Sequence, residues 1–431
     1  MIRFLYNLLF PFALLVFLPG YLVKMLRRGN YRDKFAQRLG FYDAETRARL
    51  GPGGTWLHAV SVGEVMIALK LAAQMKKQEP ALRVALTTTT TTGRALALKQ
   101  APAWIEVLYT PLDFWPIMRR AFAAIRPRRI ILVEAEVWPN LTAIAHRRKI
   151  PLALVNARLS PRSERRFQKF NVFVRPYFRK LNLICVQEPE DVARWISLGA
   201  NADRIHPVGS IKYDPENVSS SSEVPRAALQ SFGVELDRPI LLAGSTHQGE
   251  EEIIARVFLE LRRDFRDLFL IIAPRHVERV PEISNQLRAL GLESRRRSAA
   301  GSGPAAPADC LLLDTTGELR DWYSIATVVF MGKSLSARGG QNPVEVIVAD
   351  CPVVFGPHME NFANLSRSLV AAGGALQPDH EAGLTDALRE LLRDGAKRKQ
   401  LVRQARTVLD PHRGATERTA QLLARLPVQA G

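Results

Sequence analysis

The chain has 431 residues, with 60 Lys and Arg against 42 Asp and Glu, which gives a formal net charge of +18. This length favours two domains, and the balance of 47% hydrophobic and 24% charged residues argues against a disordered or fibrous protein. The charge indicates an anionic partner, but it does not distinguish between nucleic acid, anionic lipid and nucleotides.

The first predicted element is an apolar segment at the N-terminus. Residues 4–23 read FLYNLLFPFALLVFLPGYLV, about the length that crosses a bilayer, although Asn7 and two prolines weaken the pattern. No small-residue cleavage site follows, so residues 1–34 are expected to form an uncleaved membrane anchor and its basic flank. Only Arg3 precedes the segment, whereas basic residues cluster after it, which places the rest of the chain on the cytoplasmic side. A buried helix or a helix lying on the membrane surface is the alternative.

Beyond the anchor, short apolar runs alternate with amphipathic stretches, the pattern of βα units around parallel sheets. In the first half the predicted strands are 56–60, 84–87, 106–109, 130–134, 152–156, 183–186 and 205–208. The pattern breaks at DPENVSSSSEVP and resumes with strands at 240–243, 269–273, 311–314, 328–331 and 353–355. We therefore predict an N-terminal Rossmann-like domain over 35–212, a linker over 213–238 and a C-terminal Rossmann-like domain with closing helices over 239–431.

Polar residues just after the strands are candidate site residues, because ligands of open parallel sheets bind outside the carboxyl ends of the strands. In HAVSVGE, Glu64 opens a helix, whose dipole keeps a carboxylate ionised, as a base requires. In EAEVWPN, Glu134 and Glu136 follow a buried strand, where carboxylates must be solvated, paired or used. Each also has an ordinary explanation: Glu64 as a first-turn residue, and the other two as partners of nearby arginines.

The second half places small residues and polar turns after its strands, at Gly244–His247, Pro274–His276, Thr316–Glu318 and Gly339–Glu345. Such turns and helix N-termini admit phosphate, Arg275 adds a planar donor, and Glu345 can accept from ribose hydroxyls, although it also fits an ordinary first-turn glutamate. This pattern predicts a nucleotide site. No P-loop, strand-linked GxGxxG, DxD or HExxH is present, and the 3 Cys are widely spaced, so we expect no resident metal or dinucleotide.

At these motifs the sequence resembles the Kdo transferase family, membrane-bound enzymes that move 3-deoxy-D-manno-octulosonic acid (Kdo) from CMP-Kdo to the lipid A precursor. The similarity spans essentially the whole chain and is carried by HAVSVGEV at 58–65, TTTTTTGR at 87–94, EAEVWPNL at 134–141, NARLS at 156–160, GSTHQGEE at 244–251, PRHVER at 274–279, GGQNPVE at 339–345 and GPHMENF at 356–362. The resemblance implies an α/β protein of GT-B fold, with an acceptor-binding and a nucleotide-binding Rossmann-like domain facing a central cleft, anchored at the bacterial inner membrane.

Carried over by position, the resemblance implies that Glu64 is the general base and that Glu134 and Lys212 stabilise the transition state. It implies a CMP site formed by Pro274, Arg275, Thr316, Gly317, Glu318, Asn342, Pro343, Val344 and Glu345, with CMP-Kdo as donor and no metal or other cofactor. The reaction would be an inverting transfer to lipid IVA in lipopolysaccharide core biosynthesis. Gln341 stands where the family often has His, and Ser210 where it often has Asn, which bears on acceptor selectivity.

Two other functions fit parts of the sequence. A GT-B fold serves many donors, so an enzyme that uses another nucleotide sugar is the first alternative. The second is a non-enzymatic, membrane-bound binder of anionic lipid or nucleic acid, which would explain the charge of +18. For nucleic acid we expect only weak, salt-sensitive binding without sequence preference.

Overall fold

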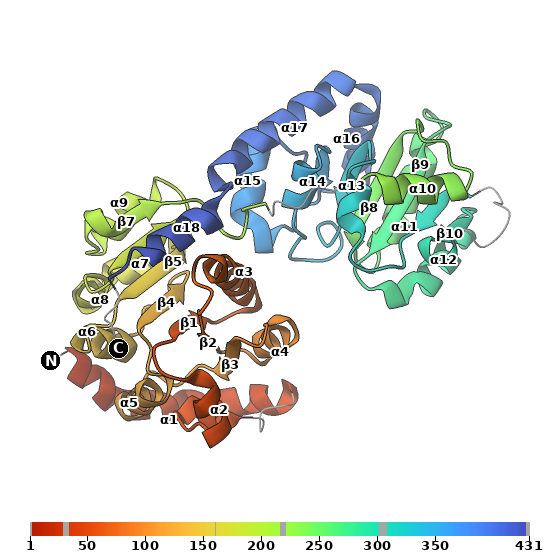
Figure 1. Ribbon diagram of the computed structural model, residues 1–431. Helices are drawn as coiled ribbons and strands as arrows, with labels where there is room; N and C mark the ends of the chain where they lie inside the picture. The colour runs from red at the N-terminus through yellow and green to blue at the C-terminus, as the bar shows by residue number, and fades with distance from the viewer. Residues whose placement is uncertain (1, 29–33, 160, 216–220, 301–307, 428–431) are drawn as a thin grey trace. The chain divides into compact units, whose positions relative to one another are not determined.

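The computed structural model describes the chain except for residues 1, 29–33, 160, 216–220, 301–307 and 428–431, and it divides into two compact units (Figure 1). The first unit comprises the chain up to Asp214 and again from His412 onward, and the second comprises Pro215–Pro411. Each unit is built on one parallel sheet with helices packed against it. The α/β class with parallel sheets is therefore confirmed.

The sheet of the first unit has seven parallel strands in the order β3-β2-β1-β4-β5-β6-β7. The strands are β1 Thr55–Ala59, β2 Val84–Thr88, β3 Ile105–Tyr109, β4 Arg129–Val133, β5 Leu152–Ala157, β6 Leu183–Val186 and β7 Ile205–Pro207. All seven agree with the predicted strands to within one residue. They read as continuous apolar runs because both faces are covered: Trp56 and Leu132 lie in one core cluster, and Leu57 and Ile131 in the cluster on the other face.

The helices of the first unit follow its strands. They are α1 Ile2–Arg28, α2 Ala44–Leu50, α3 Val62–Gln78, α4 Thr91–Gln100, α5 Trp115–Ile125, α6 Pro139–Arg147, α7 Pro161–Lys169, α8 Asn171–Phe178, α9 Asp191–Ser197 and α18 Ala415–Ala424, with short 3₁₀ turns at Phe35–Leu39 and Ala202–Arg204. Local capping explains several starts: the Thr90 hydroxyl accepts a 3.0 Å hydrogen bond from the backbone N–H of Gly93, which begins α4 inside the threonine run.

The sheet of the second unit has six parallel strands in the order β10-β11-β9-β8-β12-β13. The strands are β8 Ile240–Thr246, β9 Phe269–Pro274, β10 Ser294–Arg296, β11 Cys310–Leu312, β12 Val328–Met331 and β13 Val353–Phe355. The helices are α10 Glu223–Ser231, α11 Glu250–Leu261, α12 Val280–Ala289, α13 Leu319–Tyr323, α14 Val344–Val348, α15 Ala363–Ala371, α16 Glu381–Arg393 and α17 Gly395–Leu409. Only β10 was not predicted, because this edge strand reads Ser-Arg-Arg and is not buried.

The division of the chain differs from the predicted domains at two places. Helix α18, expected in the 239–431 domain, belongs to the first unit, because its Ala420 and Leu423 are buried in the core cluster beside α3. The predicted linker 213–238 contains α10, which belongs to the second unit, where the backbone N–H of Ser221 donates a 2.9 Å hydrogen bond to Asp321. Both differences arise from tertiary packing that local composition does not record.

Helix α1 holds the predicted anchor segment. The side chain of Asn7 exchanges two 3.0 Å hydrogen bonds with that of Asn140, and its oxygen accepts another 3.0 Å bond from the backbone N–H of Trp115. Phe10 stacks on Phe114, with ring centroids 5.2 Å apart, so one face of α1 packs on the first unit. In the part of the chain that the structure describes, no helix has the length and hydropathy of a transmembrane helix, so that prediction is not confirmed.

Candidate active site

Each sheet has one switch point, where the strand order reverses direction and two neighbouring strands are distant in the chain. In the first unit it lies between β1 and β4, since β2 and β3 extend the sheet on one side and β5 to β7 on the other. In the second unit it lies between β8 and β12. Open α/β sheets bind ligands beside such switch points, at the carboxyl ends of the strands. The two switch points therefore define where the candidate residues should lie.

Glu64 lies in the first turn of α3, just after β1. Its carboxylate accepts hydrogen bonds from the backbone N–H of Val60 (2.8 Å) and of Ser61 (3.3 Å), while the Ser61 hydroxyl accepts from the backbone N–H of Glu64 (3.3 Å). This reciprocal arrangement is a capping box. Burial raises the pKa of Glu64, and hydrogen bonds to its carboxylate from the backbone of Val60 and from the side chain and backbone of Ser61 oppose that shift. The carboxylate is thus fixed in position and more basic than usual, as a general base requires.

Glu134 follows β4 directly, with its backbone in the left-handed region at φ 61°. Such a conformation costs a non-glycine residue of order 1 kcal/mol and is often found at functional sites. Burial raises the pKa of Glu134, the charge of Glu64 raises it further, and the charges of Arg158 and Lys212 lower it. Burial lowers the pKa of Lys212, and the charge of Glu134 opposes this shift. Glu134 therefore lies within electrostatic range of both other residues predicted as catalytic, Glu64 and Lys212.

Asn156, which no motif in the sequence marked as a site residue, holds the segment before Lys212. This residue is the last but one of β5, has a φ of 51° and is 1% exposed. Its side-chain oxygen accepts a 2.9 Å hydrogen bond from the backbone N–H of Ile211 and a 3.3 Å bond from the Ser210 hydroxyl. Asn156 thus positions Lys212 through the backbone. Only the preference of Asn for left-handed backbone pointed to such a role.

Glu136 adds a third carboxyl group to this site. It accepts a 3.0 Å hydrogen bond from the indole N–H of Trp138. Burial, with added repulsion from Glu64 and Glu134, raises the pKa of Glu136 to about 7. The protonation of Glu136, and with it the charge of the site, therefore changes within the neutral pH range.

The residues predicted to bind CMP lie at the carboxyl edge of the second sheet. Pro274 ends β9 and Arg275 is exposed beside it, the 316–318 turn follows β11, and residues 342–345 lead into α14. The Asn342 side chain accepts a 3.2 Å hydrogen bond from the backbone N–H of Val344 and so fixes this turn. Glu318 and Glu345 have arginine partners, Arg297 at 3.1 Å and Arg320 at 3.9 Å, respectively. The structure therefore brings the predicted turns to one edge, with Arg275 facing solvent.

One more carboxylate, Glu250, was not singled out from the sequence. It holds the segments at this edge in place. Glu250, at the start of α11, is fully buried, with an exposed fraction of 0%. Its oxygens accept four backbone hydrogen bonds, from the N–H groups of His247 (2.9 Å), Lys333 (2.7 Å), Ser334 (2.9 Å) and Leu335 (3.0 Å). The segments after β8 and β12 are thus tied together across the switch point. The sequence shows only one of three consecutive glutamates in a first turn.

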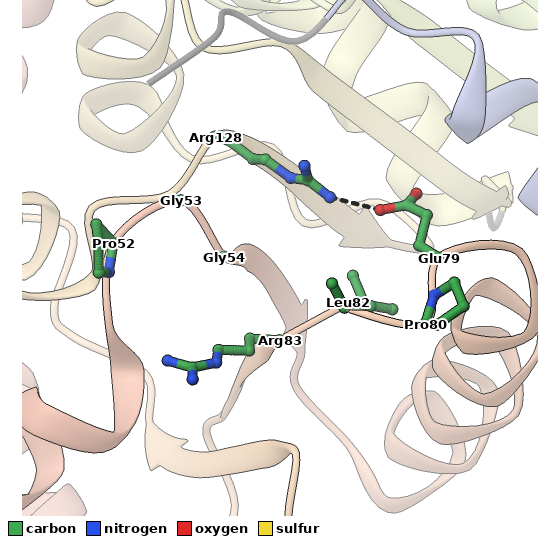
Figure 2. Close-up of a pocket in the computed structure, with 9 residues that line it drawn as sticks. Pro52, Gly53, Gly54, Glu79, Pro80, Leu82, Arg83 and Arg128 are labelled. Carbon is green, nitrogen blue, oxygen red and sulfur yellow. Dashed lines mark hydrogen bonds and ion pairs between the residues drawn. The ribbon is translucent and has the colours of Figure 1, made fainter.

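A separate pocket of about 560 Å³ lies at the other end of the first sheet. It is lined by residues at the amino ends of β1, β2 and β4, among them Gly54, Arg83 and Arg128, and Figure 2 shows Arg128 paired with Glu79. The pocket is therefore remote from Glu64 and Glu134, which follow the carboxyl ends of these strands. Among the residues described, no three His, Cys, Asp or Glu side chains are grouped to hold a metal ion.

Comparisons with known proteins identify similar sequences. Residues 33–215 match the family model described as 3-deoxy-D-manno-octulosonic-acid transferase (kdotransferase). The chain is 34% identical over 397 residues to 3-deoxy-D-manno-octulosonic acid transferase of Haemophilus influenzae, covering 91% of each chain. It is 37% identical over 408 residues to the enzyme of the same name from Bordetella pertussis, covering 92% of this chain and 93% of that one.

The fold also has solved counterparts. The glycotransferase of kitacinnamycin superposes with a TM-score of 0.52 at 16% identity, over 87% of this chain and 99% of that chain. At this identity the likeness shows the fold alone: two units with parallel sheets, as in GT-B glycosyltransferases.

Proposed function

Because the chain belongs to the 3-deoxy-D-manno-octulosonic acid transferase family, we propose that this enzyme transfers Kdo from CMP-Kdo to lipid IVA, with inversion, in lipopolysaccharide core biosynthesis. Family membership makes the chain a glycosyltransferase, so the non-enzymatic binder is no longer an alternative. The observation that carries the proposal is the buried carboxylate of Glu64, which its capping box holds within electrostatic range of Glu134, itself within range of Lys212.

The proposed reaction needs one base and no resident metal. Glu64 takes the proton from the acceptor hydroxyl while that oxygen bonds to the anomeric carbon of Kdo. The bond from this carbon to the phosphate oxygen breaks, and CMP leaves with the electron pair. Glu134 faces the positive charge that develops on the sugar, and Lys212 favours the ionised form of Glu134, because its charge lowers the pKa of that carboxyl group. Arg275 and backbone N–H dipoles are proposed to balance the charge of the departing phosphate.

The test is a transfer assay with the purified full chain, CMP-Kdo and detergent-dispersed lipid IVA, read by product mass. We expect a product heavier by one or more Kdo units, and activity that survives EDTA. Parallel reactions with UDP-linked sugars test the alternative donor class. Transfer from a UDP-sugar but not from CMP-Kdo would replace the proposed donor, and no transfer from any donor would refute the proposal.

Glu64→Gln tests the base directly, because glutamine also completes a capping box and so keeps the start of α3 intact. We expect kcat to fall about 10²–10⁴-fold, the usual contribution of a general base. The matched control is Glu45→Gln, which removes an exposed carboxylate from the first turn of α2. If Glu64→Gln keeps full activity while its fold is unchanged, the base lies elsewhere.

We also propose that α1 holds the enzyme on the cytoplasmic face of the inner membrane. While one face of α1 packs on the first unit, its other face exposes Phe4, Leu8, Leu9, Phe12, Leu15 and Val16. An exposed apolar stripe of this length inserts into the headgroup boundary of a bilayer, and basic residues beside it attract anionic lipid. The lipid acceptor is found at that surface, so the location serves the proposed reaction.

A further inference from the structure

We propose that His247 and Lys333 form a seat for the carboxylate of the donor sugar, at the switch point of the second sheet. The inference rests on the proposed function, because Kdo is an ulosonic acid and carries a carboxylate on its reacting carbon. The donor thus presents two anionic groups, the phosphate of CMP and the sugar carboxylate. A site that discriminates CMP-Kdo from other nucleotide sugars needs a partner for the second group.

The segments after three adjacent strands start side by side at this edge. The backbone N–H of Arg275, after β9, donates a 3.0 Å hydrogen bond to Thr246 at the end of β8, and Gly332, after β12, donates a 2.8 Å bond to Gly244. The rings of His247 and His276 lie edge to face, with centroids 5.8 Å apart. The topology therefore brings His247 and Lys333 to the two sides of the switch point.

Glu250 fixes both residues without neutralising them. Its oxygens accept from the backbone N–H groups of His247 and Lys333, so the carboxylate is satisfied by four N–H dipoles rather than by a cationic side chain. In the described part of the chain, no carboxylate forms an ion pair with the Lys333 ammonium. Ser245 and Lys333 are also held in the left-handed region, at φ 56° and 58°. The backbone of this half-buried cation is thus fixed, and its ammonium is left available for an anion.

His247 has one ring nitrogen to offer. Its Nδ1 lies 3.3 Å from the carbonyl oxygen of Ser245, which can only accept, so Nδ1 carries the proton of the neutral ring. No described residue forms a hydrogen bond with Nε2, which becomes a donor when the ring is protonated. Burial and the charges of Lys333 and His276 lower the pKa of His247, while Glu250 opposes them. A bound carboxylate would raise that pKa, because it stabilises the imidazolium form.

The experiment compares two ligands that differ by the sugar acid. Lys333→Met and His247→Asn are assayed for the KM of CMP-Kdo, and the Kd of CMP is measured by calorimetry on the same full-length proteins. CMP lacks the sugar carboxylate, so we expect KM to rise about 10-fold in each variant, as for loss of one charged hydrogen bond, while the Kd of CMP stays within about 2-fold. In the wild type, the ratio of KM to this Kd should fall as pH is lowered below 6.5.

Two controls frame the result. Lys399→Met removes an exposed cation from α17 and should change neither constant. Arg275→Ala should weaken CMP and CMP-Kdo alike, since it is proposed to face the phosphate.

If Lys333→Met and His247→Asn weaken CMP as much as CMP-Kdo, the cluster binds phosphate and the inference fails. It fails equally if neither ligand is affected. A wild-type enzyme that binds CMP but transfers no Kdo would instead refute the proposed function, so the two failures are distinguishable.

Discussion

At the scale of single residues, the main feature is the cluster of three carboxyl groups at the candidate active site. Burial raises the pKa of Glu64, Glu134 and Glu136, and the charge of Glu64 raises the pKa of the other two. Interacting groups of this kind titrate as a set, so the acid limb of the activity profile reports the whole cluster. Arg158 and Lys212 limit the shift by favouring the ionised form of Glu134.

This crowding predicts a pH effect of Glu136→Gln on activity. The base must be ionised, so kcat/KM should fall as pH drops through the raised pKa of the cluster. Removing one negative charge should lower that pKa and move the acid limb to lower pH by about 0.5–1 unit. The measurement is kcat/KM between pH 5 and 8, with Glu45→Gln as a control that leaves the midpoint in place. An unchanged midpoint in Glu136→Gln would mean that the charge of Glu136 does not affect the pKa of the base.

The same residue predicts a pH-dependent stability. The pKa of Glu136 is about 7 in the folded chain, above its ordinary value of 4.5, so folding favours its protonated form. The resulting stabilisation is complete below pH 4.5 and is lost as pH rises through 7. In denaturant titrations, Glu136→Gln should reduce the drop in unfolding free energy between pH 5 and pH 8 by about 2 kcal/mol, at ~1.4 kcal/mol per pKa unit. Equal drops in wild type and variant would contradict the raised pKa.

At the scale of elements, α1 has two faces with different tasks. Asn7 bonds with Asn140 and Trp115, so Asn7→Ala should destabilise the first unit by about 1–3 kcal/mol, as expected when buried partners lose their hydrogen bonds. Thermal unfolding of the full chain measures this effect. Asn7→Asp, which keeps the acceptor for Trp115, should cost less; equal losses would mean that the Trp115 bond contributes nothing.

For the outer face of α1 we expect substitutions to affect membrane binding and not stability. Replacing Leu8, Phe12 and Val16 together by Ser should leave the unfolding temperature nearly unchanged, because these side chains are 52%, 64% and 73% exposed. Binding to vesicles of anionic lipid, measured by flotation, should fall about 10-fold or more, since the apolar area that enters the bilayer is reduced. Val370→Ser, at an exposed apolar position of α15, is the matched control. If the triple variant floats as well as the wild type, the outer face of α1 is not the membrane contact.

Elements also show what could be predicted from sequence. Strands such as β1 and β9 were found because burial on both faces requires a continuous apolar run. Motifs after β1 and β4 located Glu64 and Glu134, since parallel topology brings strand ends to one edge. The role of Asn156 and Glu250 could not be predicted, because it depends on left-handed backbone and on N–H groups distant in sequence. The position of α18 was missed because its partner, α3, is more than 300 residues away in the chain.

At the scale of the whole molecule, the chain leaves the first unit after Asp214 and returns at His412. Asp214 links the segment where the chain leaves the first unit to the segment where it returns. Its carboxylate accepts hydrogen bonds from the backbone N–H groups of Gly414 (2.7 Å) and Thr416 (2.8 Å) at the start of α18. The ammonium of Lys70, in α3, donates to the backbone oxygen of Ile211 at 3.4 Å. The leaving and returning segments of the chain are therefore bonded to each other and to α3.

Asp214→Ala should destabilise the protein by about 1–2 kcal/mol, the usual cost of losing a helix cap. Asp214→Asn keeps one capping oxygen and should cost less than half as much. Denaturant unfolding monitored in each unit would locate the loss in the first unit. A loss confined to the second unit would contradict the assignment of α18.

The return of the chain at His412 also bears on synthesis. Residues 215–411 are contiguous, so the second unit can complete its core while residues from His412 onward are still inside the ribosome. The first unit begins earlier but lacks α18, and the buried Ala420 and Leu423 are synthesised only after the whole second unit. The unit that carries the proposed base is thus completed last. A ribosome stalled when residue 411 has just emerged would carry a finished second unit and an unfinished first unit.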